Sequence, residues 1–480
     1  MVFSTSIFIY LFLPVTLIIY YLMPKKGKNL IILLSGLLFY SWGEPIYVIV
    51  MLISTMIDYF AGLIMNHFEG RKVPRRICLI VSIVMNLGLL GIFKYSGFIA
   101  ENINAIAGTQ IIDINNMNFF GIEYLPMNML PIGISFFTFQ SMSYTIDLYL
   151  GNVKVQKNPI SFAAFVTLFP QIVAGPIVRY DDVAKELDDR SITIDLIYDG
   201  IIKFIIGLSK KVLIANSIGA LWTSIKATDI ANVSVVSSWL GILAFTFQIY
   251  FDFSGYSDMA IGLGKMMGFN FPKNFDYPYL SKNISEFWRR WHITLGAWFK
   301  SYVYFPLGGS RKGMPRTVFN LAVVWFLTGV WHGASWNFIL WGTLYGVVII
   351  LEKLFLGKLL DKIPDIFGHI YTMLLVILGW VLFDTADLPT AGAYIAKMFG
   401  FGGGAFIDST ALYQIATYGI TFIICIIGCT NLPKLAVEAL KKKSAVLVNY
   451  GGIAVITGMF IICAAYLVDQ TYNPFLYFNF

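Results

Sequence analysis

The chain has little charge for its size. Only 13% of its 480 residues are Asp, Glu, Lys or Arg, and 58% are hydrophobic, whereas soluble proteins carry about 25% charged residues. This shortage excludes a soluble protein. Apolar runs of about 20 residues, the length of a membrane-spanning helix, recur almost from end to end. We therefore predict an all-α polytopic membrane protein that forms a single domain over residues 1–480.

Cysteine is also scarce. The four cysteines all fall within apolar runs, and Cys425 and Cys429, one helical turn apart, have no His, Asp or Glu beside them. A structural zinc site needs four such ligands. We predict that these thiols pack in the core and that the chain binds neither a metal nor a resident cofactor; the four are Cys78, Cys425, Cys429 and Cys463.

Several sequence signatures are missing. No basic segment precedes the first apolar run, Ser6 to Met23, so we expect a retained span rather than a cleaved signal peptide. No repeat of fixed period is visible. No Gly-x-Ser-x-Gly motif occurs, which argues against a serine acyl-enzyme of the hydrolase type. The glycine-rich stretch Phe399 to Gly404 lacks the lysine of a phosphate-binding loop, and we predict an external turn there.

Lysine and arginine mark the cytoplasmic loops. Lys25, Lys26 and Lys28 follow the first apolar run, and a second basic cluster, Arg71 to Arg76, follows two more crossings. Continuing this alternation predicts about twelve crossings with both termini outside, so that residues 469–480 form an extracytoplasmic aromatic tail. The further spans are expected near 29–43, 46–65, 77–98, 199–217, 236–254, 317–333, 337–356, 370–384, 412–430 and 448–468.

The net charge of +7 lies mostly in these inner loops. It therefore indicates topology and contact with anionic lipid headgroups, not binding of nucleic acid. One stretch, Phe162 to Val178, is broken by Pro170, Gly175 and Pro176. Broken backbone at membrane depth survives only when it is buried in protein or lines a cavity, so we expect a re-entrant segment.

Two histidines stand in a tryptophan-rich stretch, His292 in Phe-Trp-Arg-Arg-Trp-His and His332 in Gly-Val-Trp-His-Gly-Ala-Ser-Trp. An imidazole can both take and give a proton near neutral pH, and an ionisable residue at membrane depth is a candidate functional group. His332 follows an apolar run, so desolvation favours the neutral ring that a general base requires. The structural alternative is a buried histidine bonded to a carbonyl; Trp331 is a candidate neighbour in either case.

His292 follows Arg289 and Arg290 on a short amphipathic stretch that we expect to lie along the cytoplasmic face. Two neighbouring cations disfavour an imidazolium, which again predicts a neutral ring. The arginines suit an anionic donor that carries phosphate, and they equally suit lipid headgroups. Both interpretations stay open.

Asp252 and Asp258 flank a Ser-Gly-Tyr-Ser sequence where a span is expected to end. They suit a supporting role beside the histidines. The favoured interpretation is that they cap exposed backbone at a broken helix.

Five stretches together resemble the membrane-bound O-acyltransferase family, and more narrowly its bacterial branch of alginate and peptidoglycan O-acetyltransferases, related to the teichoic-acid D-alanyl transferase. The stretches are Phe169–Pro176, Tyr250–Asp258, Ser281–Leu295, Tyr302–Gly309 and Leu327–Trp336, and the likeness covers nearly the whole chain. The family's near-invariant histidine matches His332, and its second polar active-site residue matches His292.

The resemblance implies a helical funnel in a bacterial plasma membrane, where a cytoplasmic donor groove meets an external cavity. It implies acetyl-CoA, or a carrier-protein thioester, as acyl donor. His332 would take the proton of the acceptor hydroxyl, and His292 would hold the donor or stabilise developing charge. The product would be an O-acetylated cell-surface or exported polysaccharide.

The ending Phe475 to Phe480 is similar to the aromatic hexapeptide that ends the small partner of the D-alanylation system. This implies that Tyr477 relays the acyl group to a separate extracytoplasmic acetyltransferase resembling SGNH hydrolases. The simpler interpretation is a tail that lies on the membrane surface.

Other functions stay open at this point. Within the same fold, the alternatives are D-alanyl transfer and acylation of a lipid or a protein. In another class, a polysaccharide or lipid transporter would also place charged residues in a multi-span bundle, but it predicts two repeat-related halves.

Overall fold

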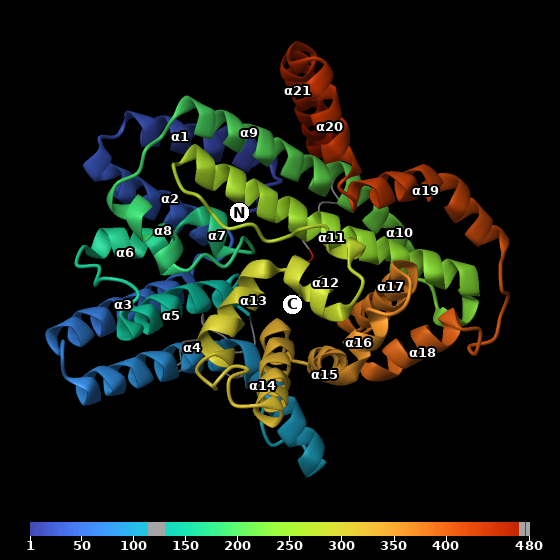
Figure 1. The fold of residues 1–480 in the computed structure, drawn as a ribbon, viewed down its shortest axis with the longest axis horizontal. Coiled ribbons are helices and arrows are strands. Elements are labelled where there is room, and N and C mark those ends of the chain that lie inside the picture. The colour runs from blue at the N-terminus through green and yellow to red at the C-terminus, as the bar shows by residue number, and fades with distance from the viewer. Residues whose placement is uncertain (114–129, 470–475, 477–480) are drawn as a thin grey trace. The chain divides into compact units, whose positions relative to one another are not determined.

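The computed structural model describes residues 1–113, 130–469 and 476. Within these ranges the chain forms helices and no strand, as the sequence predicts for an all-α protein (Figure 1). It divides into two compact units: residues 1–204 with 259–272, and residues 205–258 with 273–480. The prediction that the whole chain is one functional domain is not tested by this division.

The first unit contains helices α1 to α8 and most of α9. A buried phenylalanine cluster joins its first segment to α2 and α7, with Phe8, Phe39 and Phe169 in mutual ring contact. The helices are α1 Leu13–Leu22, α2 Lys28–Ser41, α3 Val48–His67, α4 Lys72–Ala107, α5 Ile134–Leu150, α6 Pro159–Val166, α7 Phe169–Ile172, α8 Tyr180–Asp188 and α9 Ile194–Ser209; a π-helical turn, η1 Phe8–Phe12, precedes α1.

The stretch 162–178 is broken, as expected from its prolines and glycine. It forms the end of α6 and the single turn α7, and its aromatic residues Phe162, Phe165 and Phe169 are fully buried within the first unit. This confirms a broken segment buried in protein. Its depth in a membrane stays a prediction.

The second unit holds the rest of the described chain. Its α-helices are the end of α9, α10 Asn216–Lys226, α11 Val235–Met266 as far as Asp258, α12 Ile284–Arg290, α13 Ile293–Phe299, α14 Met314–His332, α15 Trp336–Leu351, α16 Gly357–Leu360, α17 Asp365–Asp384, α18 Leu388–Met398, α19 Ser409–Gly428, α20 Leu432–Lys443 and α21 Ala445–Asp469. Three π-helical segments interrupt the α-helical runs: η5 Lys210–Ala215, η8 Lys300–Tyr304 and η9 Glu352–Leu356.

Eight helices in the described ranges are long and apolar enough to cross a membrane, and the apolar segment Phe8–Leu22 is a shorter one. Among the spans expected from sequence, those near 46–65, 77–98, 370–384 and 412–430 coincide with α3, α4, α17 and α19. The topology and the count of about twelve crossings stay predictions.

Helix α11 corrects one expectation. It runs without a break from Val235 to Met266, so no span ends at Asp252 or Asp258 and neither residue caps a broken helix. Gly255, which lies between them, serves packing instead, because a Cβ there would lie 2.7 Å from the carbonyl oxygen of Gly207. A glycine inside a helix lets a neighbouring backbone approach closely, which a turn-forming reading of Ser-Gly-Tyr-Ser does not anticipate.

Two glycines set the packing of α14 against α15. A Cβ on Gly329 would lie 2.5 Å from the carbonyl oxygen of Phe338, and one on Gly342 would lie 2.6 Å from that of Trp325. Only hydrogen at these positions permits such contact. The close approach brings His332, the last residue of α14, against Trp341 of α15.

Candidate functional site

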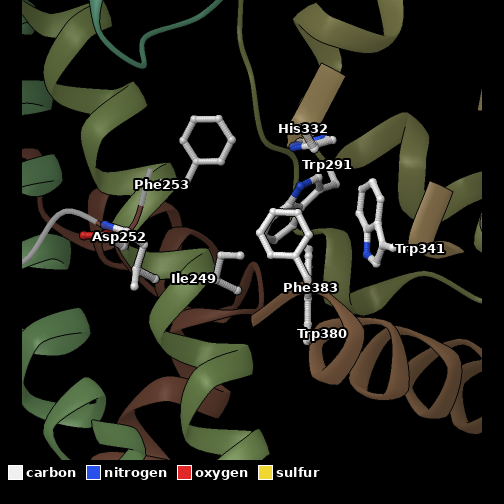
Figure 2. A pocket seen from close by; sticks show the side chains of 9 residues that line it. Ile249, Asp252, Phe253, Trp291, His332, Trp341, Trp380 and Phe383 are labelled. Carbon is white, nitrogen blue, oxygen red and sulfur yellow. The ribbon is translucent and has the colours of Figure 1, made fainter. Parts of the chain in front are cut away.

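His332 ends α14 in an aromatic cage. Its ring meets Trp341 edge-on with centroids 4.8 Å apart, and Phe383 of α17 lies 5.4 Å away (Figure 2). The imidazole is 6% exposed. The next residue, Gly333, is extended, and α15 begins only three residues later. The tight turn between the two helices thus holds the imidazole inside the protein.

The space beside His332 is small. Its volume is about 20 Å³, room for little more than one water molecule. Apolar side chains form nearly all of its wall, and of the described residues that line it Asp252 is the one with a carboxylate. The lining residues are Ile249, Asp252, Phe253, Trp291, His332, Trp341, Trp380, Phe383 and Leu476.

His292 lies between α12 and α13 in a left-handed backbone conformation, with φ 47°. It is one of two non-glycine residues in the described ranges with positive φ. Such a conformation carries strain and persists only where neighbours hold it. Here the carbonyl oxygen of Asn274 accepts the Ile293 N–H at 3.0 Å, which fastens the corner.

The side chain of Asn274 determines which nitrogen of His292 carries the proton. The Thr294 backbone N–H, which can only donate, lies 3.2 Å from Asn274 Oδ1, and the Thr294 hydroxyl donates to the same oxygen at 2.8 Å. That oxygen is therefore an acceptor. His292 Nδ1, also 3.2 Å away, must donate to it and carry the hydrogen.

Burial keeps the His292 ring neutral. The side chain is 2% exposed, and desolvation lowers its pKa to about 3. The neutral ring was expected, but its cause is burial rather than the two neighbouring arginines. With the proton on Nδ1, His292 Nε2 has a free lone pair, and it is buried with no hydrogen-bond partner in the described part of the chain. His292 Nε2 can therefore accept a hydrogen bond from a bound ligand.

The two arginines lie on α12 in different surroundings. Arg289 is exposed. The Arg290 guanidinium donates to Glu286 Oε1 at 2.8 and 3.0 Å and to the carbonyl oxygen of Asp276 at 3.2 Å. Arg290 therefore ties α12 to the segment that carries Asn274, and Arg289 is the more exposed of the two arginines.

Glu352, the first residue of η9, holds the start of α12. Its carboxylate accepts the backbone N–H groups of Ile284 and Ser285 at 2.7 and 2.8 Å, the Ser285 hydroxyl at 2.6 Å and the Tyr371 hydroxyl at 3.2 Å. The first N–H groups of a helix have no partner within it, and a negative charge there is favourable. Glu352 thereby fixes the helix that leads to Trp291 and His292.

Replacing Glu352 by Ala should lower stability by about 1–3 kcal/mol, because buried N–H donors lose their acceptor. We also expect weaker acyl transfer, since α12 carries the site. Thermal unfolding of the purified protein and the transfer rate measure the two effects. Glu438→Ala, at an exposed glutamate of α20, is the matched control, and equal behaviour of the two variants would contradict this role.

A second cavity adjoins His292. Its volume is about 240 Å³, and its walls are mostly apolar, with Lys300 as the one charged residue in the part of the chain that the structure describes. Trp291 lines both this cavity and the small one beside His332. The two histidines therefore belong to separate cavities that share an indole as part of their walls. The larger cavity is lined by Trp288, Trp291, His292, Leu295, Gly296, Phe299, Lys300, Tyr304, Leu321, Val324, Trp325 and Thr328.

The structure also places two of the three remaining candidate residues. Trp331 is buried between the histidines, with ring centroids 6.1 Å from His292 and 5.0 Å from His332. Asp252 pairs with Lys211 and lines the His332 cavity. Tyr477 lies outside the described residues.

Sequence reasoning missed Asn274, Glu352 and Lys211, which hold His292, α12 and Asp252. A polar residue in an otherwise apolar run was the available signal for Lys211 and Glu352. Nothing in the local sequence distinguishes Asn274, because its partners are 18 and 20 residues away.

The region that contains both histidines is similar to known proteins. A sequence model of the membrane-bound O-acyltransferase family matches residues 134–365, which include both histidines. The sequence is 38% identical to a probable alginate O-acetylase of Pseudomonas putida, in an alignment of 501 positions that covers 100% of each chain.

Two further relatives differ in activity. A peptidoglycan O-acetyltransferase of Helicobacter pylori is 33% identical over 84% of this chain and 80% of its own. A teichoic acid D-alanyltransferase of Bacillus subtilis is 31% identical over 48% of this chain and 61% of its own.

Proposed function

This chain belongs to the membrane-bound O-acyltransferase family, and from that premise we propose that it moves an acetyl group from cytoplasmic acetyl-CoA to a hydroxyl acceptor outside a bacterial plasma membrane, for O-acetylation of a cell-surface or exported polysaccharide. That it is a multi-pass membrane O-acyltransferase follows from the family and from its apolar helices. Family membership decides against a transporter. The donor, the acceptor and the roles below are our proposal.

The observation that carries the proposal is the pair of buried histidines on adjoining cavities. Transfer needs a base for the acceptor hydroxyl and a binding group for the thioester. The hydroxyl oxygen attacks the thioester carbonyl carbon while His332 takes its proton. The carbon–sulfur bond then breaks, and the departing thiolate takes up that proton. An ester and a free thiol result.

His292 suits the binding of the donor better than the stabilisation of a developing oxyanion. An oxyanion needs a hydrogen-bond donor, whereas His292 Nε2 is an acceptor, since Nδ1 carries the proton. The pantetheine arm of a thioester donor carries amide N–H groups that match this acceptor. The apolar cavity of about 240 Å³ supports the same assignment, with Lys300 and exposed Arg289 available to phosphate groups.

The acetyl group is favoured over D-alanine by the breadth of the similarity. The acetyltransferase relatives match 100% and 84% of this chain, but the D-alanyltransferase matches 48%. A D-alanyl donor, or a lipid or protein acceptor, is the alternative within the same chemistry. In our proposal Tyr477 relays the acyl group to an extracytoplasmic SGNH-like acetyltransferase, because a phenolate leaves an ester more readily than an alkoxide.

Labelled acetyl-CoA tests this function. The protein in lipid nanodiscs is mixed with acetyl-CoA labelled in the acetyl group, and the label is followed into a supplied polysaccharide and into the protein. We expect transfer from acetyl-CoA and none from a D-alanyl carrier thioester. Transfer from the D-alanyl thioester alone would establish the alternative, and transfer from neither would overturn the proposal.

A further inference from the structure

Lys211 and Asp252 form a buried ion pair. Lys211 Nζ lies 2.6 Å from Asp252 Oδ1, and the side chains are 3% and 2% exposed. Lys211 belongs to the π-helical segment η5, and π-turns inside helices recur at functional sites. Because desolvation of both charges offsets much of their attraction, a buried pair is weak support for stability. We therefore expect this pair to have a role other than stabilising the fold.

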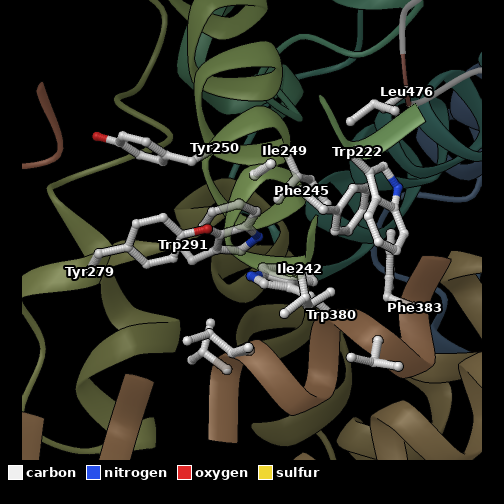
Figure 3. Close-up of a cluster of buried hydrophobic side chains, with 14 of the residues drawn as sticks. Trp222, Ile242, Phe245, Ile249, Tyr250, Tyr279, Trp291, Trp380, Phe383 and Leu476 are labelled. Carbon is white, nitrogen blue, oxygen red and sulfur yellow. The ribbon is translucent and has the colours of Figure 1, made fainter. Parts of the chain in front are cut away.

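The second oxygen of Asp252 binds a residue from the end of the chain. Asp252 Oδ2 accepts the backbone N–H of Leu476 at 3.0 Å, across 224 positions of sequence. Leu476 is 9% exposed, and its side chain joins the buried cluster that contains Trp222, Phe245 and Phe383 (Figure 3). The same side chain lines the cavity beside His332.

The ion pair is itself held in place. Lys211 Nζ also donates to Asn216 Oδ1 at 2.9 Å, so the ammonium group bridges Asn216 and Asp252. Lys211 neutralises one carboxylate oxygen and leaves the other directed at a backbone amide. A charged acceptor makes a stronger hydrogen bond than a neutral one.

We propose that the Lys211–Asp252 pair is a receptor for the main chain at Leu476, which docks this residue beside His332. Recognition through a backbone N–H fixes the position of this residue without depending on its side-chain chemistry. The docked residue forms part of the wall of the cavity that contains His332. In the context of the proposed acyl transfer, on which this consequence rests, docking holds Leu476 beside the proposed general base.

A second ion pair provides a matched control. Lys210 Nζ lies 2.7 Å from Asp258 Oδ2, with side chains 25% and 19% exposed. It joins the same two elements, η5 and α11, by the same residue types. Replacing either pair by uncharged residues removes one lysine and one aspartate charge from between these elements. Of the two aspartates, however, it is Asp252 that accepts the Leu476 N–H.

Docking is measured without any chemistry of transfer. Leu476→Cys is introduced into the full chain in nanodiscs, and its reaction with a soluble maleimide is timed; the chain without this cysteine is the blank for the native thiols. We expect slow labelling that accelerates at least tenfold in Lys211→Met/Asp252→Leu. The Lys210→Met/Asp258→Leu control should label at the parent rate. Acceleration in both double variants, or in neither, would overturn the proposal.

A change in the docked residue tests the backbone contact directly. Leu476→Pro has no N–H to donate, whereas Leu476→Ala keeps the N–H and loses the side chain. Acyl transfer to polysaccharide should fall at least tenfold in the proline variant and clearly less in the alanine variant; an equal loss in both would overturn main-chain recognition. Accelerated labelling with unchanged transfer would leave docking established and remove its role in the proposed function.

Discussion

Replacing His332 by Ala is expected to lower acyl transfer by about 10²- to 10⁴-fold, the contribution of a positioned general base. The affinity for the donor should change little, because His332 lies on a different cavity from His292. Transfer of labelled acetyl groups under conditions of saturating donor measures the effect on kcat.

A folding defect must be separated from a loss of chemistry. His332→Phe removes both ring nitrogens while retaining an aromatic ring against Trp341 and Phe383. It should therefore preserve thermal stability better than His332→Ala and be as inactive. His67→Ala, at an exposed histidine of α3, should leave the rate unchanged. A His332→Phe enzyme that works within threefold of the parent would refute the assignment of the base.

The variant His292→Asn should raise KM for the donor about 10- to 100-fold, the cost of a lost hydrogen bond to a buried group. Asparagine tolerates the left-handed backbone at this position, and its amide retains a donor toward Asn274. It lacks the Nε2 acceptor. The predicted effect is thus confined to the group that faces the larger cavity.

The same variant has a pH signature. In the folded protein the pKa of His292 is lowered from 6.5 to about 3, so between these values the unfolded chain binds a proton that the folded one does not. Stability should rise with pH across this window and be lost as pH falls through it. His292→Asn cannot titrate and should lose that part of the slope in thermal unfolding. An unchanged slope and KM together would contradict both the burial and the binding role of His292.

The class of the protein and its two candidate histidines could be predicted from local sequence. Low charge and recurrent apolar runs require a membrane protein of helices, because backbone in lipid must satisfy its own hydrogen bonds. The broken stretch 162–178 was predictable for a similar reason, since Pro170 and Pro176 cannot continue a helix. The motifs around His292 and His332 were sufficient to indicate the acyltransferase family.

Long-range partners decided the interpretation of the polar residues. Asp252 resembled a helix cap because small residues follow it, yet α11 continues and its carboxylate pairs with Lys211, 41 residues earlier. Arg290 resembled a free cation, but Glu286 and the carbonyl oxygen of Asp276 occupy its guanidinium. The capping role expected of Asp252 was wrong because the charge was judged by its neighbours in sequence.

By itself, then, the sequence determined that this is an all-helical membrane acyltransferase with two candidate histidines, because composition, periodicity and short motifs are local properties. Only the tertiary structure decided that His292 carries its proton on Nδ1, that Trp291 borders two cavities, and that Leu476 meets Asp252 beside His332. Those facts depend on contacts across tens to hundreds of residues, which close packing of helices creates.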